Sequence, residues 1–218
     1  PAAIGLDAAD VPNTLRGQYL WLGVPEYPSG WTDIDSYARY NWDEIEPSHQ
    51  SYAWQKIDDE ISAAKQRHGR FGMRIMALCQ GCGSHMYQGA HSSIPDDMAA
   101  VVNPLIGSAP GETEQYVIPD WNSTAYLDRL NELVQAIAAR YHDEPSFAFV
   151  DVFSYGNWGE FHMYPFNQPG GAYDGASQQP ISDANAKLIV QRAAAAFDNK
   201  ILVINSENPA ALTEAVNS

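Results

Sequence analysis

The stretch that decides between candidate folds runs from Gln18 to Val24 (QYLWLGV) and continues directly into Pro25-Glu26-Tyr27-Pro28 (PEYP). The apolar run predicts a buried strand that ends at the prolines, because proline cannot donate to a strand ladder. A nucleotide-binding sheet would carry a glycine-rich turn here to hold a pyrophosphate, and PEYP cannot form one. The sequence therefore favours a barrel over a nucleotide-binding, doubly wound sheet.

Away from this stretch, apolar runs continue to alternate with helical patterns. Further strands are expected at 35–42, 72–78, 147–153 and 201–205, and helices at 53–68, 122–141, 182–197 and from 209 onward. This alternation is typical of parallel β-α units, and continuous apolar strands indicate a sheet covered on both faces. We therefore expect residues 1–218 to form a single α/β domain of (β/α)8 TIM-barrel type. With about five parallel strands it is incomplete, as the amino-terminal part of a larger barrel would be.

Composition and charge exclude some classes of partner. Acidic residues outnumber basic ones 27 to 12, which gives a net charge of -15. Such a surface repels phosphate backbones, so no nucleic-acid partner is expected. No window holds enough consecutive apolar residues for a membrane span. The chain starts at Pro1, which fits either removal of a signal peptide or a cut piece of a longer chain. Its acidic balance fits an exported protein, so we expect a secreted or periplasmic location.

Residues 79–120 predict a loop of unusual length, which is typical of a functional segment or of one that contains short helices. The loop begins with a C-x-x-C motif, formed by Cys79 and Cys82. Three interpretations stay open: a small loop disulfide, two free thiols, or a zinc site completed by His85 and His91.

The segment after the strand at 147–153 carries the most specific chemistry. In a parallel sheet the ligand site lies beyond the carboxyl ends of the strands, which is where Glu160 falls. A carboxyl beside Trp158 and Phe161 is expected to be partly desolvated, which would raise its pKa and let it donate a proton to a leaving oxygen. Asn157 and His162 are expected to bond sugar hydroxyls or to hold this carboxyl in place.

One further acid is expected inside the barrel. Asp151 alternates with apolar neighbours in its strand, so its side chain should point inward. A buried carboxylate needs a partner, and Arg39 and Arg74 are the candidates.

Several stretches together resemble one enzyme group. They are Tyr37-Ala38-Arg39-Tyr40-Asn41-Trp42, Ile45-Glu46-Pro47, Pro119-Asp120-Trp121, Ala139-Arg140-Tyr141 and Gly156-Asn157-Trp158-Gly159-Glu160. In order and spacing, over about residues 18 to 208, they resemble the first five β-α units of retaining (β/α)8 glycoside hydrolases of the β-galactosidase-like group.

That resemblance implies roles for particular residues. Glu160 would be the general acid/base, and Arg39 would favour the ionised form of the nucleophile. Sugar-stacking walls would come from tryptophans, and further residues would line the site: Trp42, Trp121 and Trp158 for the walls, and Glu46, Asn157 and His162 for the lining.

The sequence departs from the group's pattern at two points. Gly159 precedes Glu160 where most members carry Asn. The group's nucleophile follows a seventh strand, which this chain does not reach, so Glu207 after the fifth strand is interpreted as a site-lining residue only.

These observations predict a glycoside hydrolase that acts on a plant or microbial oligo- or polysaccharide through carboxylate catalysis, with a retaining mechanism and without metal or cofactor. Two alternatives remain, a non-catalytic carbohydrate-binding barrel and a zinc-dependent hydrolase centred on Cys79 and Cys82. The expected partners are a carbohydrate substrate and either the remainder of the barrel or a second copy of the chain.

Overall fold

The computed structural model describes residues 20–21, 35–175, 180–205 and 207–218, with the backbone alone at 20–21. A five-stranded sheet forms its centre, and the spatial order of the strands, β1-β2-β3-β8-β9, follows their order in the chain. All neighbouring pairs run parallel. The strands are β1 (Leu20–Trp21), β2 (Ser36–Asn41), β3 (Phe71–Met76), β8 (Phe147–Asp151) and β9 (Ile201–Val203).

Sequential parallel strands that are also neighbours in space form the arrangement of a (β/α)8 barrel, of which this sheet supplies five strands. The predicted fold class is therefore confirmed as an α/β fold of this type, incomplete in the described residues. Of the run at 18–24, only Leu20 and Trp21 belong to the described residues, and the prolines at 25 and 28 lie outside them.

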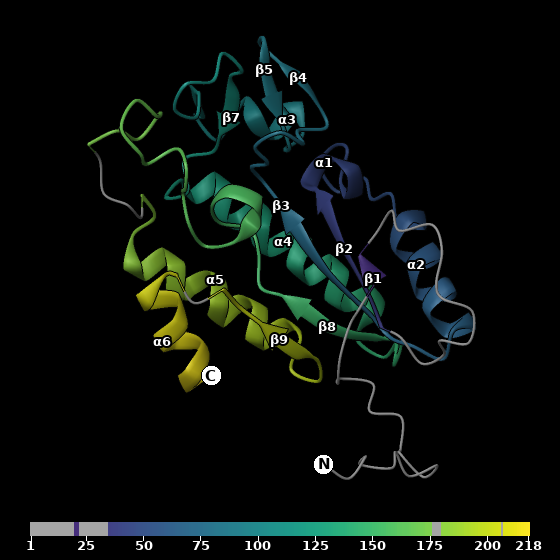
Figure 1. Ribbon diagram of the computed structural model, residues 1–218. Helices are drawn as coiled ribbons and strands as arrows, with labels where there is room; N and C mark the ends of the chain where they lie inside the picture. The colour runs from purple at the N-terminus through teal and green to yellow at the C-terminus, as the bar shows by residue number, and fades with distance from the viewer. Residues whose placement is uncertain (1–19, 22–34, 176–179, 206) are drawn as a thin grey trace, which may run out of the picture.

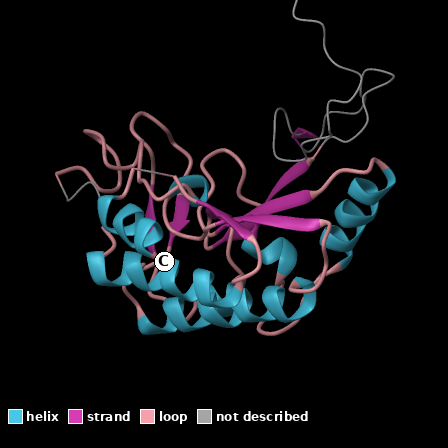
Figure 2. Cartoon of the chain, turned by 90° about the horizontal axis from the view of Figure 1, so that it is seen from below, coloured by secondary structure: helices cyan, strands magenta, loops and turns pink. Residues whose placement is uncertain are grey.

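The longer helices lie along one side of this sheet, as Figure 2 shows. They are α2 (Gln55–Gln66), α4 (Thr124–Tyr141), α5 (Asp183–Ala196) and α6 (Pro209–Asn217), and a short α1 (Trp42–Ile45) directly follows β2. The apolar residues of α4 that recur at steps of three and four, from Tyr126 to Tyr141, are buried in the core. Ser182 caps α5, since its hydroxyl accepts from the Asn185 N–H at 3.2 Å.

The two faces of the sheet differ in chemistry because side chains alternate along each strand. On the helix side, Ala38, Met73, Ile75 and Val150 are fully buried apolar residues. The opposite face, which we call the inner face, carries the charged residues. Arg39 of β2 lies directly beside Arg74 of β3 in the strand register.

Aromatic rings fill the inner face near the amino ends of the strands. The Tyr37 and Phe149 rings stack with centroids 6.0 Å apart, although β3 runs between their strands. Gly72 makes this possible, because a Cβ atom at that position would lie 2.1 Å from the Phe149 ring. The inner face is thus packed near its amino end and polar near its carboxyl end.

The segment 79–120, predicted as a loop, contains a second, four-stranded sheet of order β4-β5-β7-β6. Its elements are β4 (His85–Tyr87), β5 (Ala90–Ser92), α3 (Asp96–Ala99), β6 (Leu105–Gly107) and β7 (Tyr116–Ile118). This small sheet lies beyond the carboxyl ends of β2 and β3 (Figure 1), and its buried residues join those of the parallel sheet in one hydrophobic core. The insert therefore stands where a barrel places its ligand site.

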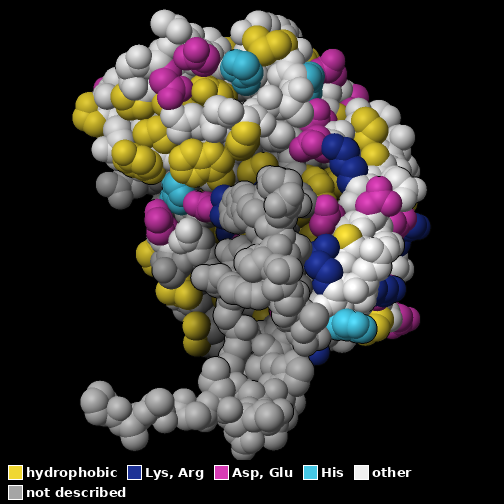
Figure 3. All heavy atoms as spheres, turned by 45° about the vertical axis from the view of Figure 1, so that its right-hand side comes forward, with side chains coloured by type: hydrophobic (Ala, Val, Ile, Leu, Met, Phe, Trp, Pro, Cys, Tyr) yellow, Lys and Arg dark blue, Asp and Glu magenta, His cyan; other side chains and the backbone are white. Residues whose placement is uncertain are grey.

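Charged side chains of both signs lie side by side on the face shown in Figure 3. Two exposed pairs connect α2 to other parts of the chain, Lys56 with Glu44 at 2.7 Å and Lys65 with Glu144 at 2.6 Å. Exposed pairs of this kind contribute about 0–1 kcal/mol each, so they add little to the stability of the fold. Within the described ranges, no helix has the length and hydropathy needed to cross a membrane.

Candidate active site

Glu160 stands at the centre of a charged cluster at the carboxyl end of the parallel sheet. It follows a short 3-10 turn, η1 (Asn157–Gly159), that comes after β8. Its Oε1 atom lies 2.7 Å from Nη2 of Arg39 and 2.8 Å from Nη1 of Arg74, and its Oε2 atom lies 3.2 Å from Nε2 of His162. The Glu160 side chain remains 18% exposed, so the carboxylate is held by three cationic or hydrogen-bonding groups and still reaches the surface.

These contacts give Glu160 a pKa opposite to the prediction. The hydrogen bond with His162 and the charges of Arg39 and Arg74 lower the pKa of Glu160 from 4.5 to about 2, although burial opposes them. The expected rise in pKa is therefore wrong. The carboxyl is surrounded by cationic groups instead of the aromatic rings that sequence adjacency suggested. The Phe161 ring is buried against Tyr155, and the Trp158 ring packs against the His162 ring at 5.9 Å.

A second acid lies beneath Glu160. Nη2 of Arg74 pairs with Oδ2 of Asp151, and the Tyr37 hydroxyl donates to the same oxygen at 2.7 Å. Burial raises the pKa of Asp151, while the charge of Arg74 and the Tyr37 hydrogen bond act in the opposite direction. The predicted inward orientation of Asp151 is confirmed, with Arg74 as its partner. A single guanidinium thus joins the buried acid to the accessible one.

The residue before Glu160 explains the departure from the resembling group's pattern. Gly159 has a φ of 69°, a conformation that favours glycine. A Cβ atom there would lie 2.9 Å from the Ile75 carbonyl oxygen and 3.1 Å from Cδ of Arg74. Any larger residue would push the turn away from β3, so glycine at this position is what allows Glu160 to reach Arg74.

Asn157 has a different role from the predicted one. It is fully buried, and its Oδ1 atom accepts from the Gln80 N–H at 3.0 Å. Its Nδ2 atom donates to the Tyr164 carbonyl at 3.0 Å and to Oε1 of Gln80 at 3.4 Å. Because these protein groups use its amide, Asn157 fixes the loop and presents nothing to a sugar hydroxyl.

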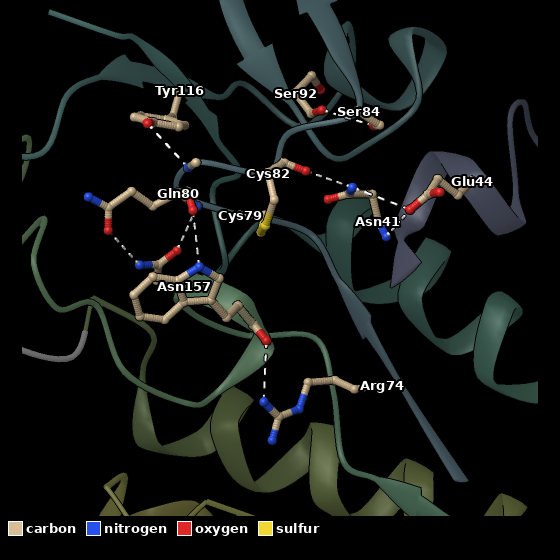
Figure 4. Close-up of a disulfide and its surroundings, with 12 residues drawn as sticks. Asn41, Glu44, Arg74, Cys79, Gln80, Cys82, Ser84, Ser92, Tyr116 and Asn157 are labelled. Atoms are coloured by element: carbon tan, nitrogen blue, oxygen red, sulfur yellow. Dashed lines mark hydrogen bonds between the residues drawn. A yellow bond between two sulfur atoms is a disulfide. The ribbon is translucent and has the colours of Figure 1, made fainter. Parts of the chain in front are cut away.

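Trp158 is the one predicted wall residue that lies beside the cluster. Its ring is partly exposed, and its Nε1–H donates to the Gln80 carbonyl at 3.1 Å. Its backbone carbonyl faces Nη1 of Arg74 at 3.4 Å (Figure 4). The backbone φ of Trp158 is 55°, so this turn depends on its neighbours to keep its conformation.

Trp42 and Glu46 do not line the site. Both are fully buried, and Nε1 of Trp42 donates to Oε2 of Glu46 at 2.7 Å. The other carboxylate oxygen of Glu46 accepts from the Gln50 N–H at 2.8 Å and from Nη2 of Arg129 at 3.3 Å. The predicted site roles are wrong for both residues. Together with Arg129 they form a buried polar network between α1 and α4.

Trp121 and Glu207 are not among the described contacts of Glu160. Trp121 is only 1% exposed, and its ring makes edge-to-face contacts with the rings of Tyr126 and Tyr155. It is therefore a core residue and does not form a sugar-stacking wall. Glu207 is exposed in the turn before α6, where its N–H bonds to Asn205 at 3.1 Å. Among the described ion pairs, none joins Glu207 to the arginines of the site.

The cysteines form a disulfide, Cys79–Cys82. Both sulfur atoms are used in this bond, so neither is a thiolate that could bind zinc. His85 lies 2.9 Å from Asp43 and 2.9 Å from Asp96, and the His91 ring packs against Tyr116. In the part of the chain that the structure describes, no three metal-ligating side chains are grouped for a metal ion. The zinc interpretation of this motif is therefore wrong for the disulfide-bonded protein.

The structure adds residues that sequence reasoning missed as parts of the site. Arg74 appeared only as a partner for Asp151, and Gln80 did not appear at all. Gln80 also donates to Glu112 at 2.5 Å, and Glu112 accepts from the Tyr116 hydroxyl at 3.1 Å. The sequence signal that could have indicated a role for Gln80 is its position inside the C-x-x-C motif, shortly after the end of β3.

No protein-family model matches the sequence, and no curated protein matches it. Solved structures are similar in fold. Endo-glycoceramidase II from Rhodococcus sp. aligns with a TM-score of 0.50 and 13% identity over 77% of this chain and 40% of that one. GH5_18 from Bifidobacterium longum subsp. longum aligns with a TM-score of 0.46 and 9% identity over 81% and 35%. Xylanase 10B from Thermotoga maritima aligns with a TM-score of 0.46 and 12% identity over 83% of this chain and 46% of that one.

The chain spans less than half the length of each of these three proteins. At such identities the similarity concerns the fold alone, and the alignment with endo-glycoceramidase II agrees with the strand order described above. The structural neighbours are glycoside hydrolases, and the described chain has the fold of part of a (β/α)8 barrel of the kind these enzymes share.

Proposed function

We propose that this chain forms part of a retaining glycoside hydrolase and that Glu160 is a catalytic carboxylate. The observation that carries the proposal is the position of Glu160. Its carboxylate is accessible at the carboxyl end of β8 and is held between Arg39, Arg74 and His162. This is the end of the sheet at which barrel enzymes place their reacting groups.

The similar solved structures support a carbohydrate ligand. Endo-glycoceramidase II is described in a cellobiose-like isofagomine complex. A neighbouring xylanase 10B, from Thermotoga petrophila, is described with xylobiose. The partly exposed Trp158 ring beside the cluster offers a flat apolar surface on which a sugar face could pack. Membership of the β-galactosidase-like group and action on a plant or microbial polysaccharide are finer parts of the same proposal.

The charge state of Glu160 favours particular chemical roles. With a pKa of about 2, the carboxylate is ionised at neutral pH, as a nucleophile or a general base must be. A proton donor would need a much higher pKa. The contacts with His162, Arg39 and Arg74 all oppose that role, because each of them lowers the pKa of Glu160. The geometry thus favours the ionised roles over the acid role predicted from the sequence.

A retaining mechanism needs a second carboxylate about 5 Å from the first. Asp151 shares Arg74 with Glu160 but lies buried beneath it, so it can tune the charge of the site and cannot reach a sugar. By the family resemblance, the second carboxylate follows a seventh strand of the barrel.

The decisive experiment uses the gene product that contains this chain, assayed on aryl β-glycosides with good and poor leaving groups. The Glu160→Gly variant should lose at least about 10³-fold in kcat on both if Glu160 is the nucleophile. If Glu160 is the acid/base, kcat/KM should fall mainly for the poor leaving group, which needs protonation, whereas kcat should fall for both because hydrolysis of the glycosyl-enzyme loses its general base. Added azide should restore turnover, giving a glycosyl azide of inverted configuration for a nucleophile variant and of retained configuration for an acid/base variant.

Glu207→Gln is the matched control, because Glu207 is an exposed glutamate after the neighbouring strand with no ion pair to Arg39 or Arg74 among the described contacts. Its turnover should stay within about twofold of the unaltered enzyme. Unchanged turnover in Glu160→Gly would reject the proposed catalytic role.

A second candidate function is a non-catalytic carbohydrate-binding barrel. The observation that favours it is the neutralisation of Glu160 by two arginines, which leaves no proton to donate at neutral pH. Binding of oligosaccharides in calorimetry without cleavage of any glycoside would support this function and exclude hydrolysis.

Two further parts of the proposal concern where the protein works and with what. The Cys79–Cys82 disulfide is typical of exported proteins, which favours a secreted or periplasmic location. Ile201 and Val203 of the edge strand β9 are 42% and 44% exposed, as expected if further barrel strands or a second copy cover them. Light scattering of the purified chain distinguishes a monomer from an assembly.

A further inference from the structure

The four-residue ring closed by the Cys79–Cys82 disulfide, hereafter the disulfide ring, lies directly against the turn that carries Glu160. Cys79 follows β3 closely and is 1% exposed, while Cys82 faces the solvent. Figure 4 shows the ring between Asn41 at the end of β2 and Asn157 on the far side. The ring therefore occupies the space between two strand ends of the candidate active site.

Gln80 is the residue through which the ring holds this turn. Its N–H donates to Oδ1 of Asn157, its carbonyl accepts from Nε1 of Trp158, and its side-chain oxygen accepts from Nδ2 of Asn157. The carbonyl of Leu78, just before the ring, accepts from the backbone N–H of Trp158 at 2.9 Å. Both residues that precede Gly159 and Glu160 are thus anchored to one short segment.

The turn contains one residue in an unfavourable backbone conformation. Trp158 has a φ of 55°, which is uncommon for a residue with a Cβ atom, whereas Gly156 and Gly159 adopt their φ values of 85° and 69° readily. Such backbone conformations persist when surrounding structure imposes them. Here the surrounding structure includes the anchors on Leu78 and Gln80 and the contact between the Trp158 carbonyl and Arg74. Asn157 is also bonded to the carbonyls of His162 and Tyr164.

The ring is itself fixed on its outer side. Nδ2 of Asn41 donates to the Cys82 carbonyl at 2.8 Å, and the Gly81 N–H donates to the Tyr116 hydroxyl at 3.3 Å. Closing a ring of four residues restricts the unfolded chain by about 2 kcal/mol, less than the about 3 kcal/mol of a 15-residue loop. In the folded protein the disulfide also restricts the conformation of residues 79–82.

We propose that the Cys79–Cys82 disulfide is a redox-sensitive clamp that fixes Gln80 as the positioning residue for Trp158 and, through it, for Glu160. The consequence for turnover rests on the proposed function, whereas the clamp itself does not. With the disulfide closed, the Gln80 carbonyl and N–H point at the Glu160 turn. With the disulfide reduced, residues 79–82 gain backbone freedom and these anchors loosen.

The reductant is a dithiol, and the order of events follows from Cys79 being buried and Cys82 being exposed. A thiolate of the dithiol attacks Sγ of the exposed Cys82, the protein S–S bond breaks, and Cys79 leaves as a thiolate that takes up a proton. The second thiol then attacks the mixed disulfide and releases Cys82 as the second protein thiol. The protein gains two electrons and two protons, and the dithiol becomes a disulfide.

The test follows the Trp158 indole proton, which bonds directly to the Gln80 carbonyl. In the ¹⁵N-labelled 218-residue chain, loss of one indole signal in Trp158→Phe assigns it. Hydrogen exchange is then measured with and without dithiothreitol. Reduction should accelerate exchange at Trp158 by at least about tenfold. The indole of Trp42, fully buried and bonded to Glu46, is the internal control and should change by less than about twofold.

Variants separate the clamp from a general effect of reduction. Cys79→Ser/Cys82→Ser should match the reduced protein and no longer respond to dithiothreitol. Ser84→Ala, in the same segment but outside the ring, should exchange like the unaltered chain. If the double variant does not fold, the reduced chain alone decides the matter. Equal acceleration at Trp158 and Trp42, or no acceleration at Trp158, would overturn the proposal.

This experiment needs no substrate, so its failure and the failure of the proposed function are separate results. Exchange that responds to reduction in a chain without glycosidase activity would leave the clamp standing. If hydrogen exchange at the Trp158 indole does not change on reduction in an active enzyme, the clamp proposal is rejected and the proposed role of Glu160 is unaffected.

Discussion

Replacing Glu160 with glutamine should make the stability of the protein less sensitive to acid. The pKa of Glu160 is lowered to about 2 by His162 and by Arg39 and Arg74. The folded state therefore stabilises the ionised form of the Glu160 carboxyl more than the unfolded state does. Such a group adds its full stabilisation above its unfolded pKa of 4.5, and loses it as the pH falls toward the folded value of about 2.

The magnitude follows from the two pKa values. Their difference corresponds to about 3.4 kcal/mol, at about 1.36 kcal/mol per pH unit. The Glu160 side chain is 18% exposed, and solvent screening of such a group reduces the expected contribution to about 1–2 kcal/mol. Roughly half of that, about 1 kcal/mol, should disappear between pH 6 and pH 3.

The assay compares urea unfolding of the unaltered chain and the Glu160→Gln variant at several pH values from 6 to 3. Titrating groups outside the Glu160 cluster are shared and cancel in the difference between the two proteins. Asp151, which shares Arg74 with Glu160, is measured as part of the same cluster. The stability advantage of the unaltered chain should shrink by about 1 kcal/mol over this range. Glu207→Gln, which removes an exposed carboxylate, should show no such trend. A constant difference between Glu160→Gln and the unaltered chain at every pH would refute the lowered pKa, and an advantage that grows in acid would reverse its sign.

Three further substitutions test other parts of the structure. Arg129→Met leaves the fully buried Glu46 carboxylate without its cation and should cost about 3 kcal/mol, seen as a fall in Tm of about 6–12 °C; a change below about 2 °C would show that Glu46 is not a buried charge. Gly156→Ala places a Cβ atom 2.3 Å from the His162 carbonyl oxygen, so it should lower Tm by at least about 4 °C and reduce turnover, and an unchanged Tm would contradict this packing. Trp121→Ala should destabilise the chain by about 3–5 kcal/mol in urea unfolding, whereas a sugar-wall tryptophan would leave stability within about 0.5 kcal/mol.

Much of the fold could be predicted from periodicity in the sequence. The steps of three and four in α4 and the alternation around Asp151 are local patterns, and each reports which face of its element is buried. The strands of the insert could not be predicted in this way. Each has only three residues, which is too short for an alternation to be distinguished from chance.

The site was harder to predict because it depends on partners distant in the sequence. Arg74 meets Glu160 only because β3 lies beside β2 and β8, and no single strand pattern gives that register. The same holds for the sign of the pKa shift at Glu160, which reflects cations outweighing burial. An indole in the sequence equally fits a core or a wall, and Trp42 and Trp121 proved to be core residues.

The insert between β3 and α4 leaves the parallel scaffold after one strand and rejoins it before the next helix. Its small sheet is built from strands of its own, none of which enters the five-stranded sheet. Its backbone pairing is therefore separate from that of the parallel sheet, while its buried side chains pack in the same hydrophobic core. An engineer could exchange this insert between relatives to change the surface next to the Glu160 cluster, provided that Cys79, Gln80 and Cys82 are retained.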